Sequence, residues 1–132
     1  MIRYVEALHL ATCRPKGVFD KDLAGELLEF LAALETAVPT SFNRFLDLGG
    51  ISEIRLSGTD LNRIAKARRA ATEKRPVCRS AIFAPTFLAH GIAKIYQELM
   101  QGSNIQVGVF SELKPAADWL QVPEAALRLP NV

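Results

Sequence analysis

The sequence has little cysteine, little net charge and no long apolar run, and each shortage excludes a class of protein. The two cysteines, Cys13 and Cys78, stand far apart and form no C-x-x-C pair, which argues against a disulfide framework and a thiolate metal site. A formal net charge of +2 is too weak to indicate binding to nucleic acid. No segment approaches about 18 consecutive apolar residues, so we expect no membrane-spanning helix.

The composition is that of one folded domain. Of the 132 residues, 49% are hydrophobic and 23% are charged, as in ordinary globular domains. Residues 1–13 are too short an apolar run for a secretion signal, because Glu6 and His9 interrupt them. We therefore expect a reduced, cytoplasmic protein, with a peripheral location at the membrane as the alternative. A bridge between Cys13 and Cys78 stays open only if their strands are neighbours.

Apolar periodicity predicts strands alternating with helices along most of the chain. Asp20 is placed to cap a helix over 21–35, and Pro85 and Gly102 fit the two ends of a later helix. Four side chains at helical spacing should form the buried stripe of that later helix: Leu88, Ile92, Ile95 and Leu99. The other predicted segments are one strand or a tight pair of strands over 2–14, strands over 41–48, 77–84 and 105–110, a helix over 58–74, and a short helix that opens at Ser111.

This alternation predicts an α/β domain over residues 1–122, followed by a poorly ordered tail over 123–132. The connections indicate a mostly parallel, mixed sheet of four to five strands with helices packed on it. Ligands of such sheets bind beyond the carboxyl ends of the strands. Here these ends lead into residues 47–57, 84–86 and 110–112.

Two stretches of this pattern resemble the STAS fold of sulfate-transporter and anti-sigma-antagonist domains, and more closely the SpoIIAA-like group of small bacterial proteins. The first stretch is FLDLGGISEIRLSGTDL, residues 45–61, which is similar to the STAS signature of a strand followed by Ser-Ser-Gly at a helix start. The second, residues 81–120, matches the group at seven positions: Gly91, Ala93, Lys94, Tyr96, Phe110, Trp119 and Leu120. The resemblance covers residues 2–122 and implies a SpoIIAA-like (STAS-like) β-α superhelix.

The sequence departs from the STAS regulators where they carry a phosphorylation switch. Aligned on Gly58, the phosphate-accepting serine of those regulators is Leu56 here, and the preceding aspartate is Arg55. Ser57 matches only the second serine. The spacing of SGTD is that of a capping box, in which Ser57 and Asp60 each accept the other's backbone N–H. We therefore expect a capped turn, with a ligand contact or a phosphorylation site at Ser57 as the alternatives.

Other candidate residues are each weighed against a structural role. Six residues form a basic run: Arg63, Lys66, Arg68, Arg69, Lys74 and Arg75. For this run we favour a solvated helix face over a site for acidic lipid, nucleotide or protein. We expect His9 and His90 at the surface, since neither has a catalytic partner by spacing. Gly91 either packs its helix closely on the sheet or leaves room for a ligand beside Phe87 and Tyr96.

We expect a non-enzymatic regulatory or protein-interaction module without catalytic residues, because no nucleophile–base pair and no carboxylate pair stands out. The alternative is a binder of a lipid or another small apolar ligand, acting at the membrane surface; an enzyme comes third. The expected partner is a protein, with self-association as a further alternative, and we expect no metal, cofactor or nucleic acid. The expected ligand or partner surface has ten residues: Asp47, Gly50, Ser57, Gly58, Asp60, Arg63, Lys66, Phe87, Gly91 and Tyr96. Asp47 would bond turn amides if its role is structural.

Overall fold

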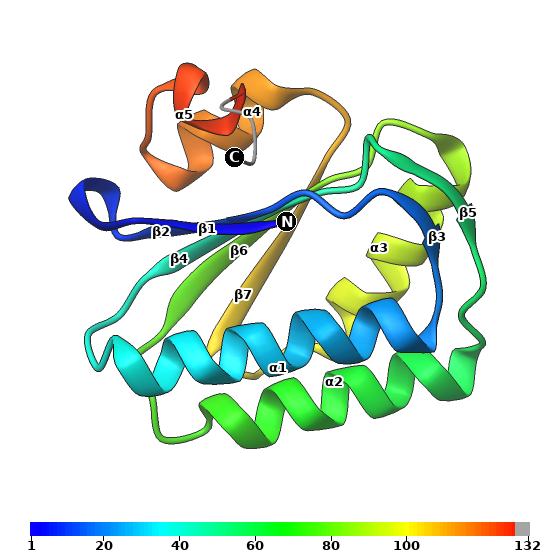
Figure 1. The fold of residues 1–132 in the computed structure, drawn as a ribbon, viewed down its shortest axis with the longest axis horizontal. Helices are drawn as coiled ribbons and strands as arrows, with labels where there is room; N and C mark the ends of the chain where they lie inside the picture. Colours follow the sequence, from blue (N-terminus) through cyan, green and yellow to red (C-terminus); the bar gives the residue numbers. More distant parts are fainter. Residues whose placement is uncertain (129–132) are drawn as a thin grey trace.

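Five strands form a mixed sheet that carries helices on both faces (Figure 1). The structure is a computed structural model and describes residues 1–128. The strand order is β1-β2-β4-β6-β7; β1 is antiparallel to β2, and the other neighbours are parallel. The strands are Ile2–Val5 (β1), Leu10–Cys13 (β2), Asn43–Asp47 (β4), Cys78–Phe83 (β6) and Ile105–Phe110 (β7).

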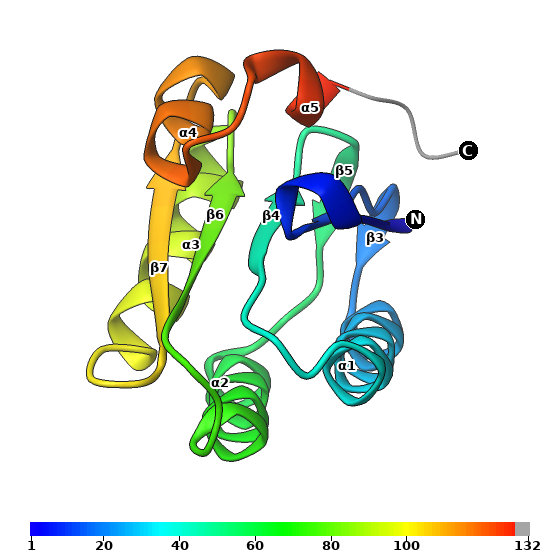
Figure 2. The same ribbon diagram turned by 90° about the vertical axis from the view of Figure 1, so that its left-hand side faces the viewer.

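Capped, amphipathic segments between the strands form the helices. Asp20, Ser57 and Thr86 each accept a backbone N–H with the side chain at a helix start. The helices are Lys21–Ala37 (α1), Gly58–Thr72 (α2), Phe87–Leu99 (α3), Leu113–Leu120 (α4) and Glu124–Arg128 (α5), with a 3-10 turn at Glu6–Leu8 (η1). Helices α1, α2 and α3 lie on one face of the sheet, and α4 and α5 lie on the other (Figure 1, Figure 2). Each parallel connection moves in the same direction across the sheet, so right-handed crossovers place α1, α2 and α3 on one side.

Alternation along the strands assigns side chains to the two faces of the sheet. Phe45 and Ala81 are aligned on β4 and β6, and they pack with Leu120 of α4 on one face. The next residues, Leu46 and Ile82, are aligned in the same way and face α1, α2 and α3. The core therefore has two layers, one on each side of the sheet.

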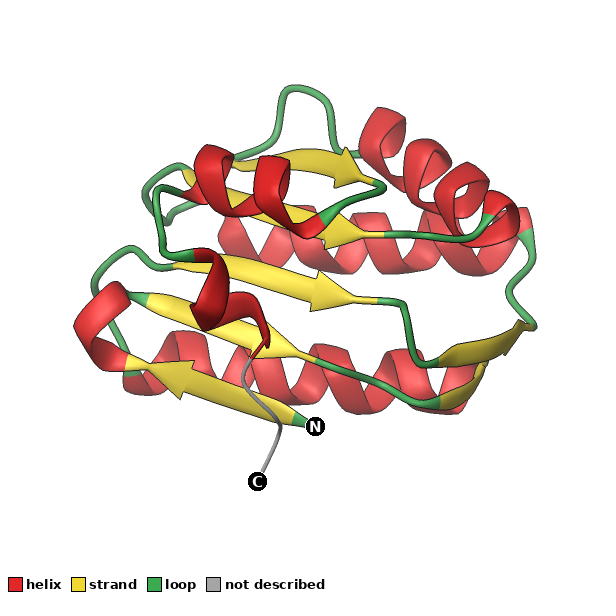
Figure 3. Cartoon of the chain, turned by 90° about the horizontal axis from the view of Figure 1, so that it is seen from above, coloured by secondary structure: helices red, strands yellow, loops and turns green. Residues whose placement is uncertain are grey.

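Two further strands, Gly17–Phe19 (β3) and Ile51–Ile54 (β5), form a separate parallel pair. Figure 3 shows this pair beyond the carboxyl ends of the main strands. The sequence analysis predicted neither of these strands. At three and four residues they are too short for alternation to be recognised.

The first segment, predicted as one strand or a tight pair over 2–14, is the tight pair. Strand β1 pairs with β2, and η1 connects them. His9 ends η1 with a φ of 48°, in the left-handed region that histidine tolerates better than most side chains. The side chain of His9 is exposed, as predicted.

Helix α3 buries only part of the predicted stripe, since Ile92 lines the space beneath the sheet and Leu99 packs against the cluster that contains Met100. Ala89 and Ala93 are buried, whereas Leu88 and Ile95 are exposed. Ala89 and Ala93 have the same helical spacing as the predicted stripe and lie one position further along, so periodicity did not separate them. Ala89 and Ala93 pack with Ile82 of the sheet.

The tail expected over 123–132 is ordered in its first half, which corrects the prediction. Glu124–Arg128 form α5, and Ala126 and Leu127 are buried. Leu127 packs into the core layer under α4, and its carbonyl accepts a hydrogen bond from Arg14. Two buried side chains in a five-residue helix are too few to give a visible apolar period. Residues 129–132 lie outside the described residues.

Cys13 and Cys78 form no disulfide, because the strands β2 and β6 are separated by β4. The register aligns Cys13 with Leu46 and then with Ile82, four residues beyond Cys78. With strands about 4.8 Å apart and about 3.3 Å per residue, the two cysteines are much too far apart for a bridge.

Candidate functional site

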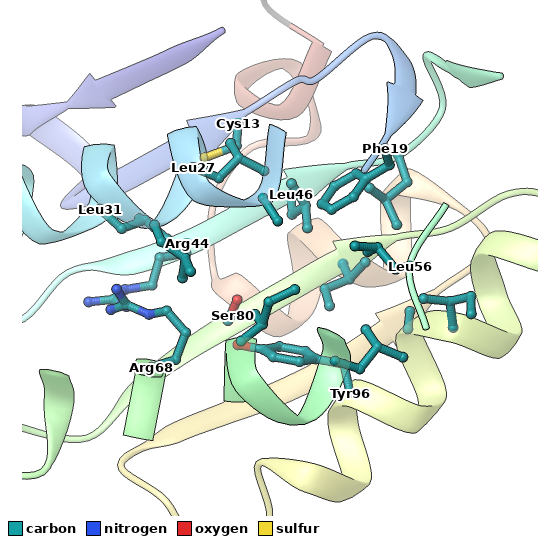
Figure 4. A pocket seen from close by; sticks show the side chains of 18 of the residues that line it. Cys13, Phe19, Leu27, Leu31, Arg44, Leu46, Leu56, Arg68, Ser80 and Tyr96 are labelled. Atoms are coloured by element: carbon teal, nitrogen blue, oxygen red, sulfur yellow. The ribbon is translucent and has the colours of Figure 1, made fainter. Parts of the chain in front are cut away.

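A cavity of about 130 Å³ lies between the sheet and the helices α1, α2 and α3 (Figure 4). Helices α1 and α2 pack against each other and lie below the sheet as a pair (Figure 1, Figure 2). The short strands β3 and β5 close one end with Phe19 and Ile54. Most of the wall is aliphatic, and it includes Leu27, Leu31, Leu46, Leu56, Ile82 and Ile92. For scale, an engineered apolar cavity of about 150 Å³ in another protein holds benzene.

The other end of the cavity is polar, because two buried arginines meet there. Glu35 of α1 accepts from Nη2 of Arg44 on β4 at 2.8 Å and from Nη2 of Arg68 on α2 at 2.5 Å, both at Oε2. The side chains of Arg44 and Arg68 are 6% and 4% exposed. Two cations thus share one buried anion, which leaves this cluster with a formal charge of +1.

The two guanidinium groups are only partly satisfied by the protein. Arg44 donates from Nε to the Phe42 carbonyl at 3.3 Å, and its guanidinium lies 4.5 Å from the centre of the Phe42 ring. Among residues 1–128, Nη1 of Arg44 and both Nε and Nη1 of Arg68 have no acceptor. An arginine has five N–H donors, so this end of the cavity has donors in excess.

Two neutral hydroxyl groups lie beside this end. Ser80 is aligned with Arg44 on the neighbouring strand, so both side chains project from the same face of the sheet. Tyr96 of α3 also lines the cavity, and burial raises the pKa of its hydroxyl to about 12. Figure 4 shows the Tyr96 hydroxyl directed towards Ser80 and the arginine end, away from Phe19 and Leu56. Neither hydroxyl has a hydrogen-bond partner within residues 1–128.

Three of the six residues in the basic run have structural roles. The expectation that the run forms a solvated helix face is therefore wrong for these three. Arg68 is buried in the cluster with Glu35. Arg69 donates to the Leu99 and Gln101 carbonyls at the end of α3, and Arg75 donates to the Glu35, Val38 and Thr40 carbonyls at the end of α1. These bonds satisfy carbonyls that a helix end leaves without partners.

Arg63, Lys66 and Lys74 are the exposed members of the basic run. None of them makes an ion pair within residues 1–128. The expectation of a solvated face is therefore correct for these three side chains. Of the predicted surface residues, Arg63 and Lys66 are on the outside of α2, facing away from the cavity.

The predicted surface residues between Asp47 and Asp60 belong to two separate turns, one at each end of β5. In the first, Asp47 Oδ1 accepts the Gly49 N–H at 2.7 Å, and Asp47 Oδ2 lies 3.8 Å from Nε of Arg14. A side chain at Gly49 would place its Cβ 2.9 Å from Asp47 Oδ1, and one at Gly50 would be 3.1 Å from the Pro15 carbonyl. The glycines and Asp47 thus have a structural role in this turn.

The second turn is the predicted capping box. Ser57 Oγ accepts the Asp60 N–H at 3.1 Å, and Asp60 Oδ2 accepts the Ser57 N–H at 2.8 Å. The bond from the Ser57 backbone is the main reason why the pKa of Asp60 is below its ordinary value. Gly58, the first residue of α2, is exposed with open space around it. The prediction of a capped turn is confirmed.

The structure does not bring Phe87, Gly91 and Tyr96 together. Phe87 is 98% exposed, and Tyr96 points into the cavity from the opposite side of α3. Nine residues separate them, which at 100° per residue amounts to about half a turn. Gly91 is exposed with nothing near its missing side chain. Both roles proposed for Gly91, close packing and room for a ligand, are therefore wrong.

His90 is half-buried, in contrast to the predicted surface position, and its Nδ1 is buried without a partner among the described residues. Within residues 1–128, no three histidine, cysteine or acidic side chains are grouped so as to hold a metal ion. Burial raises the pKa of the Cys13 thiol to about 12 and also raises that of Cys78. No helix among the described residues has the length and apolar character needed to cross a membrane.

Sequence reasoning missed three residues of the polar end, Glu35, Arg44 and Ser80. It named Arg68 only as part of the basic run, for which a solvated face was favoured. One signal was available, since Arg44 interrupts the apolar alternate positions Phe42, Leu46 and Leu48. Ser80 interrupts those of Cys78, Ile82 and Ala84 in the same way. A charged residue in the middle of such a strand needs a buried partner. That partner, Glu35, comes from α1, and no spacing along the sequence connects the two.

Comparison with known proteins bears on the fold. No family model matches the sequence, and no curated protein matches it. The structure is similar to the crystal structure of an uncharacterized protein of the DUF3478 family from Shewanella loihica PV-4, which has a SpoIIAA-like fold. The TM-score is 0.60 at 14% sequence identity, and the match covers 91% of this chain and 90% of the other. The chain therefore has a SpoIIAA-like α/β fold, as the sequence resemblance implied.

Proposed function

We propose that the protein is a non-enzymatic binding protein, which holds a small and largely apolar ligand in the cavity between the sheet and α1, α2 and α3. The single observation that carries the proposal is a cavity of about 130 Å³ with an aliphatic wall and one polar end. Binding sites for small molecules commonly combine apolar walls with a few convergent polar groups. Residues from several elements line the cavity, so a bound ligand would contact most of the core layer between the sheet and α1, α2 and α3.

The test is a titration of ¹⁵N-labelled protein with small molecules of benzene size, such as benzene and 1-hexanol, followed by NMR. Saturable shifts should concentrate on residues that line the cavity, for example Leu27, Ile82 and Tyr96. The variant Ala93→Leu places three further carbon atoms in the cavity wall, and it should lose this binding while it remains folded. Native mass spectrometry of freshly purified protein would show whether a molecule is already bound.

The matched control is Ala67→Leu, which adds the same atoms on the exposed side of α2. This variant should bind as the wild type does. Absence of saturable binding for every probe, or equal binding by Ala93→Leu and the wild type, would contradict the proposal.

A regulatory contact with a protein partner is the second candidate, and the exposed side of α3 supports it. Phe87, Leu88 and Ile95 are exposed on one side of this helix, and a patch of exposed apolar residues is typical of interaction sites. Sedimentation velocity over a range of concentrations tests the simplest partner, a second copy of the chain. A monomer at every concentration would exclude self-association and leave a different protein as the partner to be sought.

A further inference from the structure

We propose that the ligand is a small monocarboxylate, such as a short-chain fatty acid or an aromatic acid. Its carboxylate lies against Arg68, Arg44 and the Tyr96 hydroxyl, and its apolar body extends towards Phe19 and Leu56. This inference rests on the proposed function, because it names the chemistry of the molecule in the same cavity.

The charge balance of the polar end is the first argument. Arg44 and Arg68 are both buried, yet they share one oxygen of the single carboxylate of Glu35. A buried charge is costly unless it is paired, and here one of two positive charges has no counterpart in the cluster. One added negative charge brings the cluster to neutrality. A phosphate dianion would reverse the imbalance, so a monoanion fits better.

The supply of hydrogen-bond donors is the second argument. Within residues 1–128, Nη1 of Arg44 and both Nε and Nη1 of Arg68 have no acceptor, and the hydroxyl groups of Ser80 and Tyr96 have no partner. In a guanidinium Nε forms its planar donor pair with Nη2, and Nη2 of Arg68 already donates to Glu35, so Nε and Nη1 of Arg68 are single donors for a carboxylate. Figure 4 shows the Tyr96 hydroxyl directed towards the same end of the cavity.

The shape of the cavity is the third argument. All of its guanidinium and hydroxyl groups come from four side chains, and aliphatic and aromatic side chains make up nearly all of the remaining wall. A volume of about 130 Å³ suits a ligand of about six to nine non-hydrogen atoms, by comparison with cavities that hold benzene. Hexanoate and benzoate have this size, a single charge and an apolar body.

The experiment compares hexanoate with 1-hexanol and hexyl phosphate by calorimetric or NMR titration at fixed ionic strength. Hexanoate should bind about tenfold or more tightly than 1-hexanol, because a hydrogen bond to a charged group is stronger than one to a neutral group. Arg68→Met should reduce hexanoate affinity about tenfold and leave 1-hexanol binding unchanged. This substitution leaves Arg44 and Glu35 as a neutral pair, so the fold should be retained.

Tyr96→Phe removes only a hydroxyl group and serves as the second variant; it should weaken hexanoate binding several-fold without loss of structure. Lys66→Met is the matched control, since it removes a positive charge from the exposed side of the same helix, and it should bind hexanoate as the wild type does. Equal affinity for hexanoate and 1-hexanol, or tighter binding of hexyl phosphate, would overturn the monocarboxylate and leave the proposed function intact. If no probe binds, the proposed function fails as well.

Discussion

Ser57 follows Leu56, the position at which the resemblance to the STAS regulators places their phosphate-accepting serine, and its hydroxyl is engaged by the backbone. Its Oγ accepts the Asp60 N–H at 3.1 Å, so the residue is explained by the capping of α2. We expect Ser57→Ala to lower the free energy of unfolding by about 1 kcal/mol, the usual cost of losing a cap. Urea unfolding measures this, and Ser52→Ala on the exposed side of β5 is the control. A phosphate on Ser57 in protein from its natural host would contradict this interpretation.

Asp60 gives the same turn a pH dependence. Its folded pKa is below the ordinary value of 3.8, chiefly because it accepts the Ser57 N–H. A lowered folded pKa means that the carboxylate stabilises the protein fully above the unfolded pKa, and that this contribution is lost as the pH falls through the folded pKa. Asp60→Asn should therefore be less stable than the wild type at about pH 7, and the difference should shrink below about pH 4. A difference independent of pH would show that the charge of Asp60 has no part.

The thiols of Cys13 and Cys78 are buried, and burial raises the pKa of both. Because the thiolate is the reactive form, neither cysteine should react with iodoacetamide at about pH 8 in the folded protein. Both should react fully in denaturant, and mass spectrometry of the two samples counts the modified thiols. Rapid labelling of the native protein at Cys13 would show that the layer under α1 opens readily.

At the scale of elements, one carboxylate connects three of them. Glu35 joins α1 to β4 through Arg44 and to α2 through Arg68. Glu35→Gln should cost about 3–5 kcal/mol of unfolding free energy, since it leaves two buried cations without an anion. Glu29→Gln, on the exposed side of α1, should change it by no more than about 0.5 kcal/mol.

A second substitution separates charge from packing in this cluster. If the charge imbalance is the cause, Arg68→Met added to Glu35→Gln should restore part of the lost stability, because one buried cation is removed. Denaturant unfolding of the double variant provides the measurement. A double variant less stable than Glu35→Gln alone would assign the loss to packing.

The order of the elements was predictable because strands and helices differ in apolar period. The strand over 105–110 and the start of α2 at Gly58 agree with the prediction to the residue. The stripe of α3 was not predictable, since Leu88 and Ile95 fit a helical period as well as Ala89 and Ala93 do. Only the packing of α3 on the sheet decides between them. Helix α5 was missed because five residues carry too little pattern.

At the scale of the whole molecule, the fold was predictable and the candidate site was not. The resemblance in residues 45–61 and 81–120 implied the SpoIIAA-like fold that the structural comparison supports. The site joins Glu35, Arg44, Arg68, Ser80 and Tyr96 from five elements. Tyr96 was in the predicted surface, and Arg68 was named only as part of the basic run. The prediction followed the general rule that ligands bind at strand ends, whereas here the space lies under the middle of the sheet. No local sequence pattern predicts the distance between a pair of helices and the sheet that they cover.

The cavity beneath the sheet should also affect the stability of the protein under hydrostatic pressure. Unfolding removes internal voids, so a protein with a cavity loses volume on unfolding and is destabilised by hydrostatic pressure. The fluorescence of Trp119, the sole tryptophan, provides a readout from the opposite face of the sheet. We expect Ala93→Leu to unfold at higher pressure than the wild type, and saturating hexanoate to shift the wild type in the same direction. Identical transitions in all three samples would show that the cavity is already filled in solution.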